Sequence, residues 1–269
     1  MTKIVGILNI TPDSFSDAGK YNSFENALKH LQEMLINGAD IIDVGAESTR
    51  PNATPINALE EIKRLQIILP QIIFEVKKFN QKNNKKIQTS IDSYHFETIK
   101  MALESGIDIV NDVSGLVDEK IIEFIAANNI TTILMHNLAI HANPDLIINP
   151  HLNLNEEILN WANQKIAYLT KKGVKKSQLI FDPGIGFAKD ADQSIRILKN
   201  IDLYRVLELP IYIGHSKKGF LDKINCEDFG LENKDQSRAQ KTLIISQYLI
   251  DKNVDFIRVH DVKEHHKLI

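Results

Sequence analysis

Residues 4–17 read Ile4-Val-Gly-Ile-Leu-Asn9-Ile-Thr-Pro-Asp13-Ser-Phe15-Ser-Asp17, an apolar run that passes directly into polar side chains. The apolar part has the length and composition of a buried strand. The polar part holds an amide, two carboxylates, hydroxyl groups and an aromatic ring. Later apolar runs also end in polar or glycine-containing segments. A (β/α)8 barrel builds its active site in this way, at one end of its strands, so the pattern predicts that fold.

The apolar runs predict strands at residues 4–9, 40–45, 87–92, 107–112, 131–136, 178–182, 210–214 and 255–259. They are mostly continuous runs of Ile, Val and Leu, which is typical of a parallel sheet buried on both faces. The segments between them predict helices at residues 23–37, 57–79, 95–105, 118–128, 155–172, 192–206, 235–251 and from 261 onward. No shift in composition divides this alternation. We therefore predict an α/β protein with one TIM-barrel domain over residues 1–269.

The length of 269 residues is close to the ~250 typical of one such barrel. An open, doubly wound parallel sheet is the alternative architecture. The fingerprint Gly-x-Gly-x-x-Gly does not follow the first strand, and this argues against a Rossmann fold.

Composition limits the partners and the compartment. The net charge is −3, which does not suggest a general nucleic-acid or membrane surface, so an anion site should be a local cluster. No apolar run approaches the ~20 residues that span a bilayer, and no signal peptide is visible. Cys226 is the single cysteine, so no internal disulfide can form. These features predict a cytoplasmic protein that binds neither nucleic acid nor membrane.

Motifs in order along the chain carry a family resemblance. They are Gly-Ile-Leu-Asn9-Ile-Thr-Pro-Asp13-Ser-Phe15-Ser-Asp17, Gly-Ala-Asp-Ile-Ile-Asp43-Val-Gly-Ala-Glu-Ser-Thr49-Arg50-Pro51, Ile-Asp92-Ser-Tyr, Asn111-Asp-Val-Ser-Gly, Asp182-Pro-Gly-Ile-Gly-Phe187 and Arg258-Val-His260-Asp. One of these motifs would be weak evidence, but the ordered set over residues 4–262 resembles the dihydropteroate synthase family. The resemblance implies a (β/α)8-barrel transferase of folate biosynthesis. It would join 6-hydroxymethyl-7,8-dihydropterin diphosphate to 4-aminobenzoate, giving 7,8-dihydropteroate and diphosphate.

The resemblance also implies Mg2+ as a cofactor, a homodimer formed through outer helices, and inhibition by sulfonamides, which resemble the aminobenzoate. It assigns the pterin site to Asp92, Asn111, Asp182, Phe187, Lys218 and Met135. The chemistry is suitable, since a carboxylate can accept two ring N–H groups in parallel and an asparagine both donates and accepts. For any one of these polar residues the alternative is a side chain that caps a strand end.

The diphosphate site implied by the resemblance comprises Asn9, Arg258 and His260, with Asn9 also a Mg2+ ligand. An amide oxygen is a suitable hard ligand for Mg2+, which completes its octahedron with water and phosphate oxygens. Arg258 and His260 are two residues apart on the last strand, so their side chains should point to one face. A salt bridge within the barrel is the alternative for Arg258, and a core histidine is the alternative for His260.

The implied reaction is an SN1-like substitution at the exocyclic CH2 of the pterin. It needs no covalent nucleophile, and Asp92 is expected to stabilise the developing cation electrostatically. Asp13, Asp17 and Lys218 are the other predicted catalytic residues, the two aspartates by organising the loops over the substrates. The aminobenzoate pocket is assigned to Phe15, Thr49, Arg50, Pro51 and Gly219, whose backbone N–H begins a predicted helix. Alternatively, Thr-Pro-Asp-Ser is only a good turn and Ser-Thr-Arg-Pro a surface loop.

The chain departs from the family pattern in two places. Ser216-Lys217-Lys218-Gly219 stands where the family usually has Ser-Arg-Lys-Ser/Arg, so a serine hydroxyl for the aminobenzoate carboxylate is missing. Met135-His136-Asn137 replaces the usual Met-His-Met, which weakens the Met135 assignment. Two other functions stay open: a related barrel that transfers a methyl group from methyltetrahydrofolate to a corrinoid protein, and a non-catalytic barrel. The first has no use for a diphosphate site.

Overall fold

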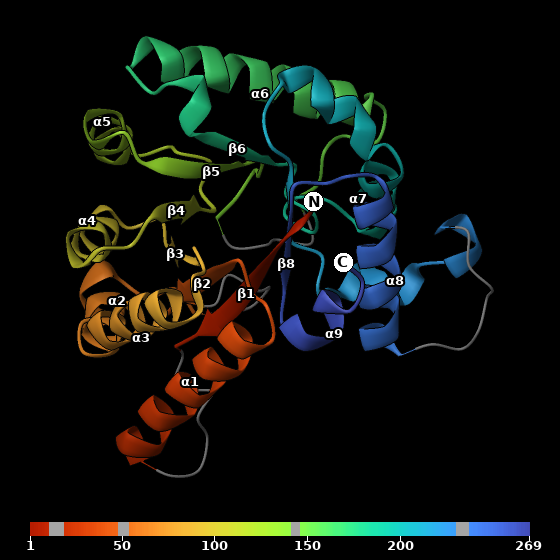
Figure 1. Ribbon diagram of the computed structural model, residues 1–269. Helices are drawn as coiled ribbons and strands as arrows, with labels where there is room; N and C mark the ends of the chain where they lie inside the picture. Colours follow the sequence, from red (N-terminus) through yellow and green to blue (C-terminus); the bar gives the residue numbers. More distant parts are fainter. Residues whose placement is uncertain (11–18, 48–53, 141–145, 230–236) are drawn as a thin grey trace.

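The predicted strands are all present in the structure, a computed structural model that describes residues 1–10, 19–47, 54–140, 146–229 and 237–269. They are β1 (Lys3–Asn9), β2 (Ile41–Gly45), β3 (Gln88–Asp92), β4 (Ile109–Asp112), β5 (Thr131–Met135), β6 (Leu179–Asp182), β7 (Tyr212–Ile213) and β8 (Phe256–Val259). Neighbouring strands pair in parallel in the order β6-β5-β4-β3-β2-β1-β8-β7. The two outermost strands meet through a single parallel bridge between Phe181 and Ile211. The predicted (β/α)8 barrel is therefore confirmed (Figure 1).

Helices alternate with the strands and lie outside them (Figure 1). The α-helices are α1 (Gly19–Ile36), α2 (Ala58–Leu65), α3 (Ile68–Asn83), α4 (Phe96–Ser105), α5 (Glu119–Asn128), α6 (Leu154–Lys171), α7 (Ala191–Lys199), α8 (Arg238–Asp251) and α9 (Val262–His266). In the described ranges of the chain, short 3-10 helices also occur: η2 (Lys176–Gln178), η3 (Ile201–Leu207), η4 (Gly219–Lys223) and η5 (Cys226–Phe229). Among the helices that the structure describes, none combines the length and the apolar character that a membrane crossing requires.

The helix predicted at residues 57–79 is in fact two helices, α2 and α3, and Pro70 explains the break. Proline has no N–H group, and inside a helix its ring clashes with the carbonyl four residues earlier. In the structure Pro70 is the third residue of α3, within the first turn, where no N–H bond is needed. Asn57 begins α2 by accepting a hydrogen bond from Glu60 N at 3.0 Å.

The helix predicted at residues 192–206 also divides, into α7 and η3. Asn200 lies between them, and its side-chain amide donates to Arg196 O at 2.8 Å, thereby satisfying a carbonyl at the end of α7. The strand predicted at residues 210–214 is shorter in the structure, where β7 has only two residues. Pro210 precedes it and cannot donate to a ladder, although its carbonyl accepts from Phe181 N at 2.8 Å.

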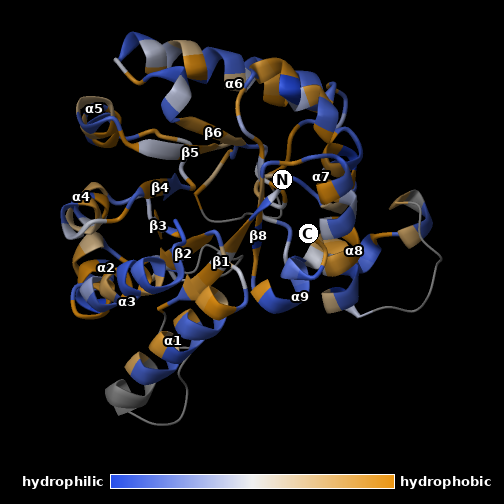
Figure 2. Ribbon diagram, viewed as in Figure 1, coloured by the Kyte–Doolittle hydropathy of each residue, from blue (hydrophilic) through white to orange (hydrophobic). Residues whose placement is uncertain are grey.

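Two apolar regions make up the core. A larger one packs the outward faces of the strands against the helices, and the strand β1 is largely hydrophobic along its length (Figure 2). The smaller one fills the interior of the barrel, and we call it the apolar plug: Val5, Ile41, Ile109, Ile133, Ile180, Tyr212 and Phe256. The plug takes one residue from each strand except β3, so its members show which positions of those strands point inward.

Candidate active site

Alternation along the strands places a layer of polar side chains beside the apolar plug. Successive side chains of a strand point to opposite faces, so the residue two positions after an inward residue also points inward. The residues two positions after Ile41, Ile109, Ile180 and Phe256 lie toward the carboxyl ends of the strands. Together with Asp92 of β3 they form what we call the polar layer: Asp43, Asp92, Asn111, Asp182 and Arg258.

Asp43 is the centre of hydrogen bonding in the polar layer. It lies on β2 and is fully buried. Its carboxylate accepts from Arg258 Nε at 2.6 Å and from Asn111 Nδ2 at 3.1 Å, and it also accepts from Ser90 Oγ. Sequence reasoning assigned no role to Asp43, although a carboxylate inside an apolar run was a usable signal. The bond from Asn111 fixes the orientation of an amide predicted to face the pterin.

Arg258 joins two carboxylates from neighbouring parts of the sheet. Its Nη2 donates to Asp92 Oδ2 at 2.5 Å, in addition to the bond from Nε to Asp43. The alternative considered for Arg258, a salt bridge within the barrel, is the contact that the structure contains. Burial raises the pKa of Asp92 to about 7, and the Arg258 guanidinium opposes that rise. Burial alone would lower the pKa of Arg258, but the carboxylates outweigh it and raise that pKa.

Asp182 and Lys218 form the other half of the predicted pterin site. Asp182 Oδ1 accepts from Gly184 N at 2.7 Å, and burial raises the pKa of Asp182 while Lys218 lowers it. Lys218 Nζ donates to Ile185 O at 2.5 Å and lies 4.6 Å from the centroid of the Phe187 ring. Burial lowers the pKa of Lys218 to about 8, against the opposing effect of Asp182. The structure thus brings together these three predicted pterin residues.

A buried lysine behind this half of the site was not predicted. Lys189 Nζ donates to Phe187 O at 2.8 Å and to His136 O at 3.2 Å, and it lies 2.9 Å from His136 Nδ1. Burial lowers the pKa of Lys189 to about 7. These contacts join the segments that follow β5 and β6. The signal was a lysine close after the glycine-rich segment, but only the fold shows that it turns inward.

The remaining described site residues lie around the polar layer. Met135 is buried at the end of β5, where it pairs in register with Asp182. Asn9 is exposed at the end of β1. His260 follows β8, and its Nδ1 lies 2.9 Å from Ser216 Oγ. His260 therefore contacts the segment after β7, whereas Arg258 reaches into the barrel, so the two predicted diphosphate ligands have different surroundings.

A Mg2+ site can be tested against the donors present. In the part of the chain that the structure describes, no group of three or more His, Cys, Asp or Glu side chains could hold a metal ion. Mg2+ does not need such a group, since it is commonly held by one or two protein oxygens, phosphate oxygens and water. The exposed amide of Asn9 at the end of β1 fits that requirement.

Several predicted residues lie outside the described part of the chain: Asp13, Phe15, Asp17, Thr49, Arg50 and Pro51. Gly219 is described, and it begins η4, a 3-10 helix of five residues. The predicted helix start is therefore only a short 3-10 turn with a small dipole. A β-carbon placed on Gly219 would meet no heavy atom within 4 Å, so the backbone there faces open space.

The arrangement can bind a flat polar heterocycle and an anion together. Carboxylates and an amide provide hydrogen-bond acceptors and donors inside the barrel mouth, and Lys218, Phe187 and Met135 add a cation and apolar surface. Comparisons with known proteins agree with this chemistry. The model of the pterin binding enzyme family matches residues 5–260.

Curated and solved relatives are similar over nearly the whole chain. Dihydropteroate synthase of Streptococcus pyogenes serotype M6 is 36% identical over 267 residues, which cover 99% of this chain and 92% of the relative. The crystal structure of the Anaplasma phagocytophilum enzyme with bound 6-hydroxymethylpterin-monophosphate has a TM-score of 0.85 and 34% identity, covering 100% of this chain and 96% of that one. The Xanthomonas albilineans enzyme with 4-aminobenzoic acid has a TM-score of 0.83 and 26% identity, covering 99% and 90%. The chain therefore belongs to the pterin-binding enzymes and, within them, to the dihydropteroate synthase family.

Proposed function

We propose that the polar layer, together with Lys218, binds 6-hydroxymethyl-7,8-dihydropterin diphosphate for condensation with 4-aminobenzoate, the reaction of a dihydropteroate synthase. The observation that carries this proposal is the set of buried carboxylates at the carboxyl ends of the strands, held by Arg258 and bordered by Lys218. Asp182 and Asn111 would bind the pterin edge, and Phe187 and Met135 would contact its faces. Family membership supports the same reaction.

The bond changes assign a task to each charged group. The bond from the exocyclic CH2 to the diphosphate oxygen breaks, and its electron pair leaves with the diphosphate. The pterin ring shares the positive charge that develops on the carbon, and Asp92 lowers the energy of that charge. The amine of 4-aminobenzoate then donates its electron pair to the carbon and loses a proton. At ~4 Å such a charge pair contributes on the order of 1 kcal/mol in water but ~4 at an effective dielectric of 20, so exclusion of water strengthens it.

Arg258 has a further task under this proposal. It is already bonded to Asp43 and Asp92, so its charge stands at the edge of the pterin site before any substrate arrives. Arg258 and His260 would meet the diphosphate, with Asn9 holding a Mg2+ ion. When bound, Mg2+ would supply positive charge to the leaving diphosphate. Asn9 and the diphosphate oxygens are the ligands we expect.

The 4-aminobenzoate would lie against Phe15, Thr49, Arg50 and Pro51, with its carboxylate near the backbone N–H of Gly219. Asp13 and Asp17 would organise the first of these segments. A sulfonamide has the same aniline ring and an acidic group in place of the carboxylate, so we expect it to compete at this site. Gly219 offers no hydroxyl, which should leave the carboxylate contact weaker than in relatives with serine.

We also infer a homodimer in the cytoplasm. The outer face of α8 supports the homodimer, because Leu243 and Ile244 are only half-buried there while Ile245 and Leu249 pack inward. Light scattering on purified protein would measure the mass, and a monomer at micromolar concentration would refute the dimer.

A single cysteine, Cys226, is compatible with a reducing compartment.

Diphosphate release is the experiment that tests the function. We expect Mg2+-dependent release from dihydropterin diphosphate, coupled to dihydropteroate formation when 4-aminobenzoate is present. Asp182→Asn should weaken pterin binding in calorimetry, whereas Asp202→Asn, in an exposed ion pair with Lys252, should not. Tight pterin binding without turnover would refute the synthase function in favour of a methyltransferase-like or non-catalytic barrel.

A further inference from the structure

Lys189 is a cation enclosed by the segments that follow β5 and β6, and it is only 7% exposed. Its ammonium group has three N–H donors. Three acceptors are within reach of Nζ: Phe187 O at 2.8 Å, His136 Nδ1 at 2.9 Å and His136 O at 3.2 Å. We call Lys189, His136 and Phe187 the Lys189 cluster. Because these contacts can use every donor of the ammonium group, the cluster holds the backbone of two segments at once.

His136 is a neutral ring that can accept a hydrogen bond from Lys189. Burial, together with the Lys189 cation, lowers the pKa of His136 to about 2. The ring therefore carries one proton, and with that proton on Nε2 the other nitrogen, Nδ1, is an acceptor. The same ring packs against Trp161, with centroids 4.8 Å apart and planes at 76°. The imidazole is thus held by a lysine and by an aromatic ring.

The backbone at Ala188 directs Lys189 inward. Ala188 has a φ angle of 52°, in the left-handed region that residues with a β-carbon seldom adopt. It lies between Phe187 and Lys189, so the chain turns sharply there, and Lys189 Nζ reaches the carbonyl two residues earlier. A strained conformation persists only where surrounding contacts compensate for it. The bonds of the Lys189 cluster are contacts of that kind.

His136 also contacts the beginning of the segment after β6. Its N–H donates to Asp182 O at 2.9 Å. Its carbonyl lies so close to Gly184 that a β-carbon there would be 2.0 Å from His136 O, and Gly184 has a φ angle of 71°. Only glycine permits this approach. The backbone of His136 is therefore fixed to the start of the segment, and Lys189 fixes it to the end of the segment at Phe187.

The segment 182–187 carries or contacts three predicted pterin groups. Asp182 Oδ1 accepts from Gly184 N at 2.7 Å. Ile185 O accepts from Lys218 Nζ at 2.5 Å, and the same Nζ lies 4.6 Å from the centroid of the Phe187 ring. A carboxylate, a cation and an aromatic ring are thus arranged around one short segment. Their relative positions depend on how firmly that segment is held.

We propose that Lys189, acting through His136 and Phe187, is a positioning residue that sets the affinity for the pterin. This inference rests on the proposed function, in which Asp182, Phe187 and Lys218 bind the pterin. Lys189 does not bind the substrate itself, because its donors are used within the protein. Without it the segment 182–187 would lose its fixed end at Phe187, and pterin binding would then have to order the segment.

Lys189→Met is the principal test, because methionine has a similar length and no N–H donor. We expect the Kd for dihydropterin diphosphate, measured by calorimetry, to rise about tenfold or more, the effect of one or two lost hydrogen bonds. At saturating pterin diphosphate, kcat and the KM for 4-aminobenzoate should change less than about twofold, since the contacts of the Lys189 cluster lead to pterin residues.

Two variants of His136 test the path through the ring. His136→Leu removes the ring acceptor and keeps the backbone carbonyl, so we expect a smaller rise in the pterin Kd, about three- to tenfold. His136→Asn should recover part of that loss. Its Oδ1 is as many bonds from the backbone as Nδ1 and can accept from the Lys189 ammonium.

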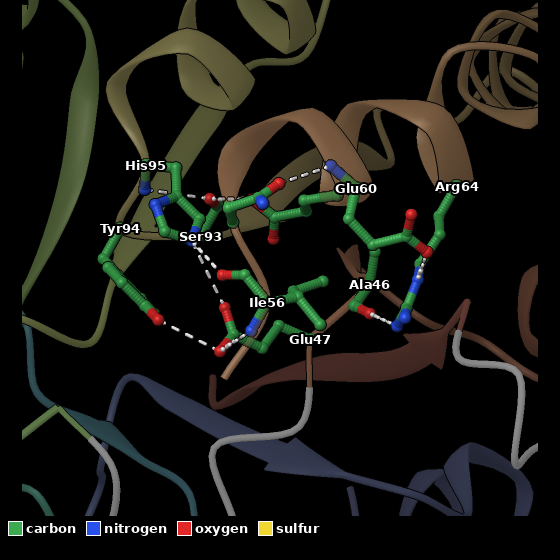
Figure 3. Close-up of polar contacts among 10 residues, drawn as sticks. Ala46, Glu47, Ile56, Glu60, Arg64, Ser93, Tyr94 and His95 are labelled. Atoms are coloured by element: carbon green, nitrogen blue, oxygen red, sulfur yellow. Dashed lines mark hydrogen bonds and ion pairs between the residues drawn. The ribbon is translucent and has the colours of Figure 1, made fainter. Parts of the chain in front are cut away.

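Arg64→Met is the matched control. Arg64 Nη1 also donates to a backbone carbonyl just after a strand, Ala46 O at 2.9 Å, and Nε donates to Glu60 Oε1 at 3.1 Å (Figure 3). That carbonyl follows β2, a strand to which no pterin residue is assigned. Removal of this cation should therefore change the pterin Kd less than about twofold, although it also removes a bond to a strand-end carbonyl.

A general structural role for Lys189 would give a different set of constants. It would raise the KM for 4-aminobenzoate and lower kcat together with pterin affinity, and that result would overturn the inference. An unchanged pterin Kd in Lys189→Met would overturn it as well. If Lys189→Met does not fold, the two His136 variants decide, and equal pterin affinity in both of them would refute the path through the ring.

Asp182→Asn separates this inference from the proposed function. If Asp182→Asn weakens pterin binding and Lys189→Met does not, only the inference is wrong. If the wild-type chain does not bind dihydropterin diphosphate, the proposed function is wrong and the inference fails with it. The double variant of Lys189→Met with Phe187→Leu should be less than additive in pterin affinity, because Lys189 acts through the position of Phe187. Full additivity would contradict that path.

Discussion

The apolar plug and the polar layer occupy adjacent levels inside the same barrel, and four of the five polar-layer residues lie two positions after a plug residue of the same strand. At the first level Ile41 and Phe256 meet other apolar side chains. At the next level Asp43 and Arg258 meet each other at 2.6 Å. The backbone geometry is shared, so the difference lies in side chains alone. The strands can thus be stabilised at one level and carry chemistry at the next.

The two levels differ in how strictly they specify their residues. Apolar packing tolerates a substitution of similar volume, because dispersion and water exclusion have no direction. The polar layer does not tolerate such a substitution, since its buried charges depend on hydrogen-bond partners at fixed angles. Substitutions at the two levels should therefore separate stability from activity, and the predictions below are ordered from the largest effect to the smallest.

Arg258→Met should have the largest effect, because it leaves Asp43 buried beside Asp92 without their shared cation. We expect a loss of roughly 3–5 kcal/mol in the free energy of unfolding. Synthase activity should also be lost. Urea denaturation measures the stability. Arg238→Met is the control, because its ion pair with Asp222 is exposed and should contribute about 0–1 kcal/mol. Equal stability of the two variants would break the contrast between a buried and an exposed pair.

The pH profile of kcat/KM for the pterin substrate should be bell-shaped. Burial raises the pKa of Asp92 to about 7, so its carboxylate form is gained as the pH rises through that value. Burial lowers the pKa of Lys218 to about 8, so its cation is lost above that value. Each limb should approach about a tenfold change per pH unit. In Asp92→Asn the acidic limb of the profile should disappear. If the limb persists, the ionisation of a group other than Asp92 causes it.

Ile133→Val tests the apolar plug. Removing one methyl group from this buried residue should reduce the free energy of unfolding by roughly 0.5–1.5 kcal/mol. The kinetic constants should stay within about twofold of wild type, because the residue contributes packing only. Thermal unfolding and steady-state kinetics on the same sample provide both values. A clear change in kcat would show that the plug influences the reacting groups and is not only support.

Gly219→Ser should have the smallest effect and the opposite sign. The position faces open space and its φ angle is not in the left-handed region, so a serine fits without strain. A hydroxyl there should lower the KM for 4-aminobenzoate by about two- to tenfold. Gly219→Ala is the matched control, since it fills the same space without a hydroxyl. If alanine lowers the KM equally, the gain comes from reduced backbone freedom.

The sequence was sufficient to predict the barrel and most of the polar layer. Continuous apolar runs predicted the strands. The family resemblance assigned Asp92, Asn111 and Asp182 to one pterin site and Arg258 to the diphosphate site, with a salt bridge within the barrel as the alternative for Arg258. The role of Asp43 as a shared hydrogen-bond acceptor could not be predicted in the same way. Its bond with Arg258 joins residues 215 positions apart, and it depends on the register between β1 and both of its neighbours.

The helix boundaries show the same limit at shorter range. The break before Pro70 follows from a missing N–H and was available in the sequence, whereas the break at Asn200 depends on a side-chain contact with Arg196 O. The inward turn of Lys189 likewise depends on carbonyl groups of two different segments. Patterns along one chain predict elements well, and contacts between elements need the fold.

The barrel closes between β6 and β7 through one bridge, and this has a consequence for inhibitors. Asp182 ends β6 and Lys218 follows β7, so the two halves of the predicted pterin site stand on opposite sides of the least bonded seam of the sheet. A pterin bound to both residues would link β6 to the segment after β7. Because it binds only the folded state, it would also raise the free energy of unfolding. Amide exchange at Phe181, whose N–H donates to Pro210 O across the seam, should slow when such a ligand binds. A compound that contacts only Asp182 or only Lys218 should bind without slowing amide exchange at Phe181.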